Sequence, residues 1–299
     1  MQSTRKRLRA ILAGSGPIVA PGVYDCLSAL VAQQAGFKVL MVTGSGVAAS
    51  ALGVPDIGVM TMVDVLNVTR SIAQCVDVPV IADCDTGYGN PMNVMRTVRE
   101  FENAGVACLF IEDQVAPWRC GHFEGKQVIS SHDMVKKIEA ALEARIDADL
   151  MIMARTDTLV THGFDEAVSR ARAYVAAGAE MLLISAPRSR EEIAAIGSAL
   201  KSLDVPLLIN MTEGVRTPLL SAAELGEMGY KVISFAGSLQ RVALKAMQDL
   251  AQSLHATGSV DGFYPERMDG IESRSRVLNL DRYYELEKRF ASDGDIVHV

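Results

Sequence analysis

The sequence predicts a single (β/α)8 barrel, or TIM barrel, on three observations. Eight short apolar runs rich in β-branched residues alternate with longer segments of helical period, the pattern of a repeated strand-helix unit with a buried parallel sheet. Three helical segments end in glycine just before the next apolar run. Polar side chains follow the apolar runs, as in enzymes built on this fold.

A predicted helix follows each of the eight predicted strands, which is the order that a closed barrel requires. The strands are expected at 18–21, 39–43, 78–82, 107–111, 151–154, 181–184, 206–209 and 232–235. The helices are expected at 28–36, 62–76, 93–104, 132–145, 164–177, 190–203, 221–228 and 239–254, where apolar residues recur at helical spacing.

Glycines mark the ends of three of these helices. Gly36, Gly105 and Gly178 each lead into a predicted strand. We expect them to adopt the left-handed conformation that commonly ends a helix. An open doubly wound sheet is the rival fold, but it usually carries a glycine-rich fingerprint after its first strand, and Pro-Gly-Val-Tyr at 21–24 is not one. A closed barrel is therefore favoured.

The chain is expected to form a catalytic barrel over residues 1–254 and a C-terminal helical arm over residues 255–299. Its length of 299 residues is typical of one barrel domain. Gly258, Gly262 and Pro265 interrupt the helical pattern, which returns in a charged stretch around 283–290. Because it returns too late to close the barrel, we expect the arm to pack on a neighbouring subunit.

Composition disfavours several classes of protein. A net charge of -7 and a pI near 5.3 argue against a nucleic-acid partner. No apolar run reaches the roughly 18 residues of a membrane span, and the N-terminus lacks a signal-peptide pattern. Five cysteines without paired spacing indicate neither a disulfide framework nor zinc, so a cytoplasmic protein is expected. The basic cluster near the N-terminus is interpreted as a solvated helix face and comprises Arg5, Lys6, Arg7 and Arg9.

Candidate site residues follow the predicted strands, because the loops after the strands of a barrel converge on one face. In strand order they are Thr43, Gly44 and Ser45 after the second, Asp83 and Asp85 after the third, Glu112 and Asp113 after the fourth, Arg155 and Asp157 after the fifth, Ser185 after the sixth, Asn210, Thr212 and Glu213 after the seventh, and Ser238 and Arg241 after the eighth.

Asp83 and Asp85 indicate a divalent metal. Residues two apart on a strand point the same way, so both carboxylates are expected to enter the barrel mouth together. Two like charges so placed need a cation. Oxygen ligands without His or Cys at metal spacing favour Mg²⁺, with Mn²⁺ as the second choice. The spacing alone also fits a structural role, in which Asp83 caps the loop and Asp85 opens an Asp-Thr-Gly turn.

Cys120 differs from the other cysteines in its neighbours. Arg119 and His122 lie beside it, and positive neighbours favour the reactive thiolate. Cys75 and Cys108 fit small buried hydrophobic residues, and Cys120 could be one as well. The residues therefore leave both a reactive and a structural cysteine open.

Arg155 ends an apolar strand, so its guanidinium is expected in the barrel mouth. There it either holds a substrate carboxylate through two hydrogen bonds or forms a structural ion pair with Glu112 or Asp157. Asn210 and Thr212 are two apart and are expected to line the same wall as donors to substrate oxygens. Thr212 alone fits equally well as a helix cap.

Together these motifs resemble the isocitrate lyase and phosphoenolpyruvate mutase superfamily, close to its methylisocitrate lyase and dimethylmalate lyase branches. The resemblance covers nearly the whole chain, and so many motifs in the same order make it specific. They are Thr-Gly-Ser-Gly-Val-Ala at 43–48, Pro-Asp at 55–56, Asp-Cys-Asp-Thr-Gly-Tyr-Gly at 83–89, Ile-Glu-Asp-Gln at 111–114, Arg-Cys-Gly-His at 119–122, Met-Ala-Arg-Thr-Asp at 153–157 and Asn-Met-Thr-Glu at 210–213.

The resemblance implies a homotetramer of barrels whose last helix swaps between subunits. It also implies that Mg²⁺ is held by Asp83 and Asp85, with Asp56 and Glu112 acting through water. The activity it implies is Mg²⁺-dependent cleavage of a carbon-carbon bond in a small 2-hydroxy dicarboxylate or tricarboxylate, of the 2-methylisocitrate or 2,3-dialkylmalate type. The products would be a 2-keto acid such as pyruvate and a carboxylate.

The resemblance further assigns roles to the site residues. The backbone of residues 43–45 and Arg155 would hold the keto-acid half, Asn210 and Thr212 would hold the other carboxylate, and Cys120 would donate the proton from a loop that closes over the substrate. The expected catalytic residues are Cys120, Arg155 and Glu112. The expected substrate-binding residues are Thr43, Gly44, Ser45, Gly121, His122, Arg155, Ser185, Asn210, Thr212 and Arg241.

Two departures from the family pattern bear on the substrate. Trp118 stands where lyases acting on isocitrate or methylisocitrate usually have a basic residue, and Ser185 stands where they have a glutamate. Losing both charges disfavours a tricarboxylate and favours a smaller or more apolar malate derivative.

Several alternative functions stay open or are disfavoured on particular residues. Oxaloacetate hydrolysis or decarboxylation at the same metal stays open. A phosphoenolpyruvate mutase or phosphonopyruvate hydrolase activity is disfavoured, because such enzymes generally lack the Cys-Gly-His motif found at 120–122. A non-catalytic binding module is disfavoured by the intact set Asp83, Asp85, Cys120 and Arg155.

Overall fold

The predicted barrel is present and closed. The computed structural model describes residues 3–291 except 122 and 124, and within them eight parallel strands pair in chain order, β1 closing the ring on β8. Every predicted strand overlaps an observed one, and β6 and β8 match their predicted bounds. The strands are β1 Ile18–Val23, β2 Leu40–Val42, β3 Val80–Asp83, β4 Cys108–Glu112, β5 Met151–Thr156, β6 Met181–Ile184, β7 Leu207–Asn210 and β8 Val232–Phe235.

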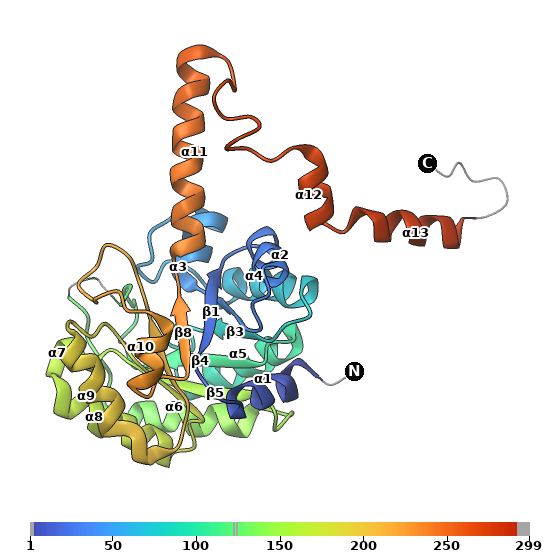
Figure 1. Cartoon of the computed structure of the whole chain (residues 1–299). Coiled ribbons are helices and arrows are strands. Elements are labelled where there is room, and N and C mark those ends of the chain that lie inside the picture. Colours follow the sequence, from blue (N-terminus) through green and yellow to red (C-terminus); the bar gives the residue numbers. More distant parts are fainter. Residues whose placement is uncertain (1–2, 122, 124, 292–299) are drawn as a thin grey trace. The chain divides into compact units, whose positions relative to one another are not determined.

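Helices surround the strands, as Figure 1 shows for the blue-to-yellow part of the chain. In the barrel they are α1 Thr4–Ala13, α2 Cys26–Gln34, α3 Gly44–Val47, the π-helix η1 Ala48–Leu52, α4 Met62–Cys75, α5 Pro91–Ala104, α6 Ser131–Ala144, α7 Thr158–His162, α8 Phe164–Ala176, α9 Arg190–Leu200, the 3-10 turn η2 Lys201–Leu203 and α10 Ala222–Glu227. The chain continues into α11 Ser238–Thr257, α12 Ile271–Val277 and α13 Leu280–Phe290.

The three predicted glycine stops have the expected conformation. Gly36, Gly105 and Gly178 have φ values of 94°, 96° and 103°, in the left-handed region where a residue with a Cβ is strained. These turns bring the chain from each helix back to the amino-terminal end of the next strand. Short turns of this kind keep the strands in chain order around the ring.

Alternation along the strands separates two apolar layers. One set of strand residues packs against the helices, and the other fills the inside of the barrel. The inner set includes two residues of α1, Leu8 and Leu12, so α1 closes the end of the barrel at which the strands begin. The strand members of the inner set are Ala20, Met41, Ile81, Cys108, Phe110, Met151, Met153, Met181, Leu183, Leu208 and Val232.

The same alternation carries polar residues into the barrel mouth. Two residues beyond an inner apolar side chain, the next inward position lies at the carboxyl end of the strand. On six strands this position holds a residue with a polar side chain that the sequence singled out. They are Thr43 after Met41, Asp83 after Ile81, Glu112 after Phe110, Arg155 after Met153, Ser185 after Leu183 and Asn210 after Leu208.

The expected solvated basic face of α1 is wrong for two of its four residues. Arg5 pairs with Asp147 at 2.8 Å between Nη1 and Oδ2, and its Nε donates to the carbonyl of Val106. Arg9 pairs with Glu180 at 2.7 Å. These contacts reach loops at the lower ends of the strands, so the basic residues help to hold α1 under the barrel.

The chain divides into two compact units, residues 1–240 and 241–299. The division falls inside α11, whereas the sequence placed it after residue 254. In the second unit no residue of α12 or α13 is buried, and Ile271, Tyr283 and Phe290 are each at least 65% exposed. Packing of this unit on a neighbouring subunit stays a prediction.

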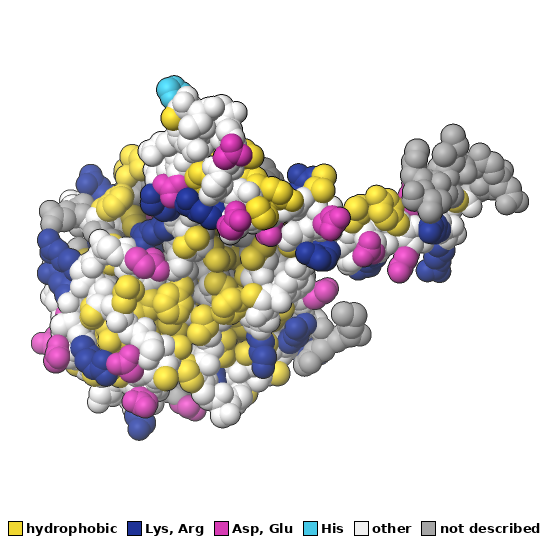
Figure 2. Space-filling view, turned by 45° about the horizontal axis from the view of Figure 1, so that its top comes forward, with side chains coloured by type: hydrophobic (Ala, Val, Ile, Leu, Met, Phe, Trp, Pro, Cys, Tyr) yellow, Lys and Arg dark blue, Asp and Glu magenta, His cyan; other side chains and the backbone are white. Residues whose placement is uncertain are grey.

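Two further features of the described residues bear on the expected partners. Among residues 3–291, with the two gaps noted above, no helix has both the length and the apolar character that crossing a bilayer demands. On the face shown in Figure 2, acidic and basic side chains are interspersed.

Candidate active site

Buried carboxylates gather where β3 and β4 end. Asp83, Asp85 and Glu112 are each no more than 8% exposed. Backbone groups orient Asp83, because the N–H of Gly44 donates to its Oδ2 at 3.1 Å and the N–H of Asp85 donates to its Oδ1 at 3.0 Å. The N–H of Glu112 donates to the carbonyl of Asp85 at 2.8 Å. These three buried acids, called the acidic cluster below, are thus held next to one another.

Asp85 lies near Asp83, as the sequence predicted, but strand alternation is not the reason. β3 ends at Asp83, so Asp85 is not a strand residue two places further on. Asp85 instead has a φ of 46° in the loop that follows. Aspartate tolerates this left-handed conformation better than most residues. The loop, not the strand alternation, turns Asp85 back toward Asp83.

Trp118 supports this acidic cluster through Tyr88. The phenol of Tyr88 donates to Oδ2 of Asp85 at 2.7 Å, and its ring packs edge to face against Trp118 with 5.7 Å between centroids. Trp118 is only 6% exposed. The sequence analysis treated Trp118 as a departure from the family pattern that bears on the substrate. In the structure Trp118 instead packs behind the acidic cluster.

The acidic groups raise one another's pKa. Burial raises the pKa of Asp85 well above its ordinary range, and the charges of Asp83 and Asp56 raise it further. Burial also raises the pKa of Asp83 and Glu112, although the charge of Arg155 opposes both shifts. Burial and then the charge of Asp83 raise the pKa of Asp56 to about 6.

The acidic cluster fits a hard divalent cation. Oε1 of Glu112 and Oδ1 of Asp56 are buried without a hydrogen-bond partner, and a nearby cation would relieve both this loss and the mutual repulsion. Within the described chain, no group of three or more His, Cys, Asp or Glu side chains is arranged to hold a metal ion by itself. Mg²⁺ does not need one, because it is commonly held by one or two carboxylates with water and substrate. Asp83 and Asp85 are the two neighbouring carboxylates that could hold such a cation.

Gly44 fits beside these acids because it lacks a side chain. A Cβ there would lie 3.1 Å from Oδ2 of Asp83 and 3.2 Å from Oδ1 of Asp85. Its N–H is already donated to Asp83, so this part of the expected substrate contact has a partner within the protein. Thr43 is buried with its Oγ1 unpartnered, whereas Ser45 is exposed.

Arg155 forms both of the ion pairs that the sequence left open. Its Nη1 lies 2.8 Å from Oε2 of Glu112, and its Nε lies 2.8 Å from Oδ2 of Asp157. Asp157 also pairs with Lys126 at 2.7 Å, and the Lys126 side chain is 2% exposed. Burial alone would raise the pKa of Asp157, but Arg155 and Lys126 lower it to about 2. Asp157 is thus a fixed negative charge between two cations.

Asp113 anchors this network from the side away from the site. Its Oδ1 accepts from the N–H of Asp157 at 3.0 Å, and its Oδ2 accepts from the hydroxyls of Thr156 and Tyr174. Nη1 of Arg170 lies 3.2 Å from the same Oδ2. A fully buried carboxylate thereby fixes the backbone from which Asp157 extends.

The segment Cys120–Gly121 lies against Arg155. A Cβ on Gly121 would be 2.6 Å from Oγ of Ser185 and 3.0 Å from Nη2 of Arg155. Cys120 is half-buried, and its N–H donates to the carbonyl of Asp56 at 3.1 Å. Lys126 donates its ammonium to the carbonyl of Gly121. The predicted contact residue His122 lies outside the described residues.

Other predicted residues lie at the carboxyl ends of β6 and β7. Asn210 ends β7 with Oδ1 buried and unpartnered, and Thr212 is 7% exposed. The N–H of Ser185 donates to the carbonyl of Thr156 at 3.0 Å. Arg241 belongs to the second compact unit.

Sequence reasoning missed Lys126 and Tyr88. Lys126 lies between Gly125 and Gln127, and no motif or spacing marks it as a buried cation. Tyr88 is part of the Asp-Thr-Gly-Tyr segment, so a hydroxyl three residues after Asp85 was an available signal. Both act on groups that the sequence did identify.

The chain matches known proteins over most of its length. The family model for phosphoenolpyruvate phosphomutase matches residues 8–255. The chain is 41% identical to 2,3-dimethylmalate lyase of Eubacterium barkeri over 290 residues, which is 97% of this chain and 99% of that protein. It is 41% identical to 2-methylisocitrate lyase of Aeropyrum pernix over 284 residues, which is 95% of this chain and 89% of that protein.

A solved structure of oxaloacetate acetylhydrolase with the inhibitor 3,3-difluorooxalacetate also superposes on the chain. The TM-score is 0.92 at 35% identity, over 98% of this chain and 99% of that one. The match extends through all the strands that carry the acidic cluster and Arg155. The chain therefore belongs to the phosphoenolpyruvate mutase and isocitrate lyase superfamily of enzymes.

Proposed function

We propose that the chain is a Mg²⁺-dependent lyase that cleaves a carbon-carbon bond in a small 2-hydroxy carboxylic acid, yielding a 2-keto acid and a second carboxylate. The observation that carries the proposal is the position of Arg155. It is a buried cation, held by Glu112 and Asp157, with the Cys120–Gly121 segment on one side and the acidic cluster on the other. A carboxylate substrate has a charged partner there, next to a site for a metal.

The metal site would serve the first half of the reaction. Mg²⁺, when bound, supplies positive charge that stabilises a negative oxygen on the substrate. Asp83 and Asp85 would hold it, and Glu112 would link it to Arg155 through the 2.8 Å ion pair. Glu112, whose Oε1 has no hydrogen-bond partner, would accept the proton of the substrate hydroxyl as the carbinol carbon becomes a carbonyl and the adjacent carbon-carbon bond breaks.

The electron pair of that bond passes to the departing half, which then needs a proton. Arg155 would stabilise charge on carboxylate oxygens as the bond breaks. Cys120 would donate the proton to the departing carbon as general acid. Asn210 and Thr212 would hold the carboxylate of the departing half.

The choice between 2-methylisocitrate and 2,3-dialkylmalate as the substrate rests on the side chains around Ser185. The relatives at 41% identity are named for one substrate of each kind. Ser185 next to Gly121 leaves this wall without the glutamate of the methylisocitrate-cleaving enzymes.

Oxaloacetate hydrolysis is the second candidate, favoured by the TM-score of 0.92 with oxaloacetate acetylhydrolase. In that reaction water supplies the attacking oxygen, and the same carbon-carbon bond position is broken. The half that departs would still need a proton from the site. The two reactions therefore share residues and differ in the substrate that they accept.

One experiment tests the proposal against its rivals. The purified protein is incubated with Mg²⁺ and, separately, with isocitrate, 2-methylisocitrate, 2,3-dimethylmalate, oxaloacetate and phosphonopyruvate, and products are identified by mass spectrometry. A keto acid released from one of the first three supports the lyase. Oxalate and acetate from oxaloacetate alone would replace it with the hydrolase, and turnover of phosphonopyruvate alone would replace both.

Two further expectations belong to this proposal. The five cysteines all lie within the described residues and none is in a disulfide, which supports a reducing location such as the cytoplasm. The exposed apolar residues of α12 and α13 support assembly into a homotetramer.

A further inference from the structure

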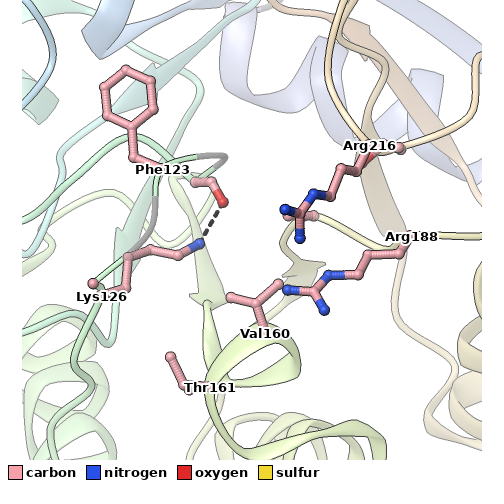
Figure 3. Close-up of a pocket in the computed structure, with 10 residues that line it drawn as sticks. Phe123, Lys126, Val160, Thr161, Arg188 and Arg216 are labelled. Atoms are coloured by element: carbon pink, nitrogen blue, oxygen red, sulfur yellow. Dashed lines mark hydrogen bonds between the residues drawn. The ribbon is translucent and has the colours of Figure 1, made fainter.

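The segment that carries Cys120 is held from both sides by different groups. On the side that follows it, Lys126 donates its ammonium to the carbonyl of Gly121, and Figure 3 shows this contact on the wall of a pocket. On the side that precedes it, the chain contacts the acidic cluster through Trp118. The proposed function gives Trp118 no role, although the sequence departs from the family pattern at this residue.

Tyr88 connects Trp118 to the acidic cluster. Its phenol donates to Oδ2 of Asp85 at 2.7 Å, and its ring packs edge to face against the indole with 5.7 Å between centroids. The backbone of Tyr88 has a φ of 60°, a left-handed conformation that is rare for a bulky residue. Such a conformation persists only where the surrounding contacts fix the residue. The two contacts of the Tyr88 side chain are among those that do so.

The loop of residues 56–58 makes a second connection to the same segment. A Cβ on Gly58 would lie 2.9 Å from the backbone nitrogen of Trp118, so the two backbones are in direct contact. The N–H of Cys120 donates to the carbonyl of Asp56 at 3.1 Å. The backbone from Trp118 to Cys120 therefore lies against the acidic residues at both of its ends.

Packing alone does not fix the rings of Tyr88 and Trp118. Both line a cavity of about 400 Å³, which Met60 and Met62 also line. Rings beside a cavity have fewer packing contacts than rings in a filled core. The hydrogen bond from Tyr88 to Asp85 is thus an important constraint on the pair. A cation on Asp85 would hold that carboxylate in one orientation and would strengthen the constraint.

We infer that Trp118 is a positioning residue that couples the metal site to the segment carrying Cys120. A divalent cation held by the acidic cluster would fix Tyr88. Tyr88 would in turn fix Trp118 and the backbone that leads to Cys120. The inference rests on the proposed function, because the metal and the role of Cys120 come from it. Coupling between two sites is reciprocal, so a change at Trp118 should weaken Mg²⁺ binding although Trp118 is not a metal ligand.

The fluorescence of Trp118 tests this coupling directly, because it is the only tryptophan in the chain. The full-length protein, freed of metal by chelation and dialysis, is titrated with Mg²⁺ while tryptophan emission is recorded. Calorimetry measures the affinity for Mg²⁺ in parallel. We expect a saturable change in emission whose midpoint coincides with that of the calorimetric titration. Neither measurement requires a substrate.

The substitution Tyr88→Phe removes the phenol hydroxyl and keeps a ring against Trp118. It should weaken Mg²⁺ binding about 10-fold, the lower end of the loss typical for groups that hydrogen-bond a metal ligand. The emission change at saturating Mg²⁺ should disappear. Tyr230→Phe is the matched control, because Tyr230 likewise donates one hydrogen bond, to the carbonyl of Ile193 at 3.0 Å, before β8 begins. It should leave both the affinity and the emission change unaltered.

The substitution Trp118→Leu tests the effect on the segment itself. Hydrogen exchange of peptides containing Cys120 is measured by mass spectrometry with and without Mg²⁺, after circular dichroism has shown that the variant is folded. Mg²⁺ should slow this exchange in the unmodified protein but not in the variant. The variant should also bind Mg²⁺ about 5-fold more weakly, the lower end of the range for coupled sites. Trp118→Phe keeps an aromatic ring, should retain part of the effect, and replaces the leucine variant if that one does not fold.

Four results would each overturn the inference. They are an emission that does not respond when calorimetry shows Mg²⁺ binding, an emission change that survives Tyr88→Phe, an equal loss in Tyr230→Phe, and equal slowing of exchange at Cys120 in Trp118→Leu. Absence of Mg²⁺ binding would remove the inference together with the metal assignment.

The outcome is separable from that of the proposed function. If no acid in the panel is cleaved but Mg²⁺ changes the emission of Trp118 through Tyr88 and slows exchange at Cys120, the lyase proposal fails and the coupling stands. If a keto acid is released but the emission of Trp118 does not respond to bound Mg²⁺, the lyase stands and the coupling is refuted.

Discussion

Arg155 and Asp157 are two residues apart on and after β5, and their side chains form a 2.8 Å ion pair inside the barrel mouth. The pair is not isolated, because Glu112 holds the other end of the guanidinium and Lys126 holds the other oxygen of Asp157. This chain of alternating charges joins the acidic cluster to the Cys120–Gly121 segment. A substrate carboxylate would therefore meet an arginine whose orientation is already fixed.

Asp157→Asn should destabilise the fold by about 3 kcal/mol, because removing one member of a buried pair leaves the others uncompensated. The folded pKa of Asp157, about 2, lies below its ordinary value, so its contribution is complete above pH 4 and is lost as the pH falls toward 2. Urea unfolding should thus show a difference between variant and unmodified protein that shrinks at low pH. Glu139→Gln, which breaks an exposed pair with Lys136, should cost under about 1 kcal/mol. A pH-independent difference would contradict this account.

Gly121→Ala should lower kcat/KM by roughly 10- to 100-fold, since its Cβ would push Ser185 or Arg155 out of position. Adding Ser185→Ala removes the closer contact, at 2.6 Å, and should restore part of the loss. Gly270→Ala is the control, because a Cβ there meets only ordinary contacts at 3.6 Å and beyond. A double variant no better than Gly121→Ala would show that the contact with Ser185 is not the cause.

Chelation of divalent metal should abolish turnover, and Mg²⁺ should restore it. Calorimetry should show Mg²⁺ binding that Asp85→Asn removes and that Asp77→Asn, at an exposed site, retains. Because the pKa of Asp56 is about 6 without metal, protons compete with the cation and affinity should rise as the pH increases through 6. Full activity in protein shown by elemental analysis to lack metal would refute the metal assignment.

Structural features that recur along the chain could be predicted from the sequence, whereas contacts that a single loop makes could not. Strand alternation and helix-ending glycines recur, so the barrel, its order and six inward positions could be derived from period alone. Asp85 depends on a left-handed loop residue, and Lys126 on a loop that folds back over Asp157. Arg188 and Arg216 line the same pocket only because the loops after β6 and β7 converge. Contacts made by one loop with another leave no periodic trace in the sequence.

The second unit should mediate assembly into a tetramer. Tyr283, Leu286 and Phe290 lie on one short helix, α13, and all are exposed in the chain alone. Phe290→Asp should therefore shift sedimentation toward smaller species, whereas Lys288→Glu should not. A stable, active monomer of the unmodified protein at micromolar concentration would exclude the tetramer as the functional form.

Cys120→Ser separates a proton donor from a buried cysteine. If Cys120 protonates the departing carbon, serine should lower kcat by about 100- to 10,000-fold with little change in substrate binding, because its hydroxyl is a far weaker acid of nearly the same size. Arg155→Ala should weaken both binding and turnover, since a carboxylate partner acts in the ground and transition states alike.

Cys75→Ser is the matched control for the thiol. Cys75 is also half-buried, but burial and its neighbour Cys26 raise its pKa to about 12, so it has no reactive thiolate to lose. Its substitution should leave kcat unchanged. Single-turnover measurements with the best substrate of the panel distinguish the chemical step from binding. If Cys120→Ser retains the full rate of that step, the proton comes from another group, and the resemblance to cysteine-dependent lyases loses its chemical basis.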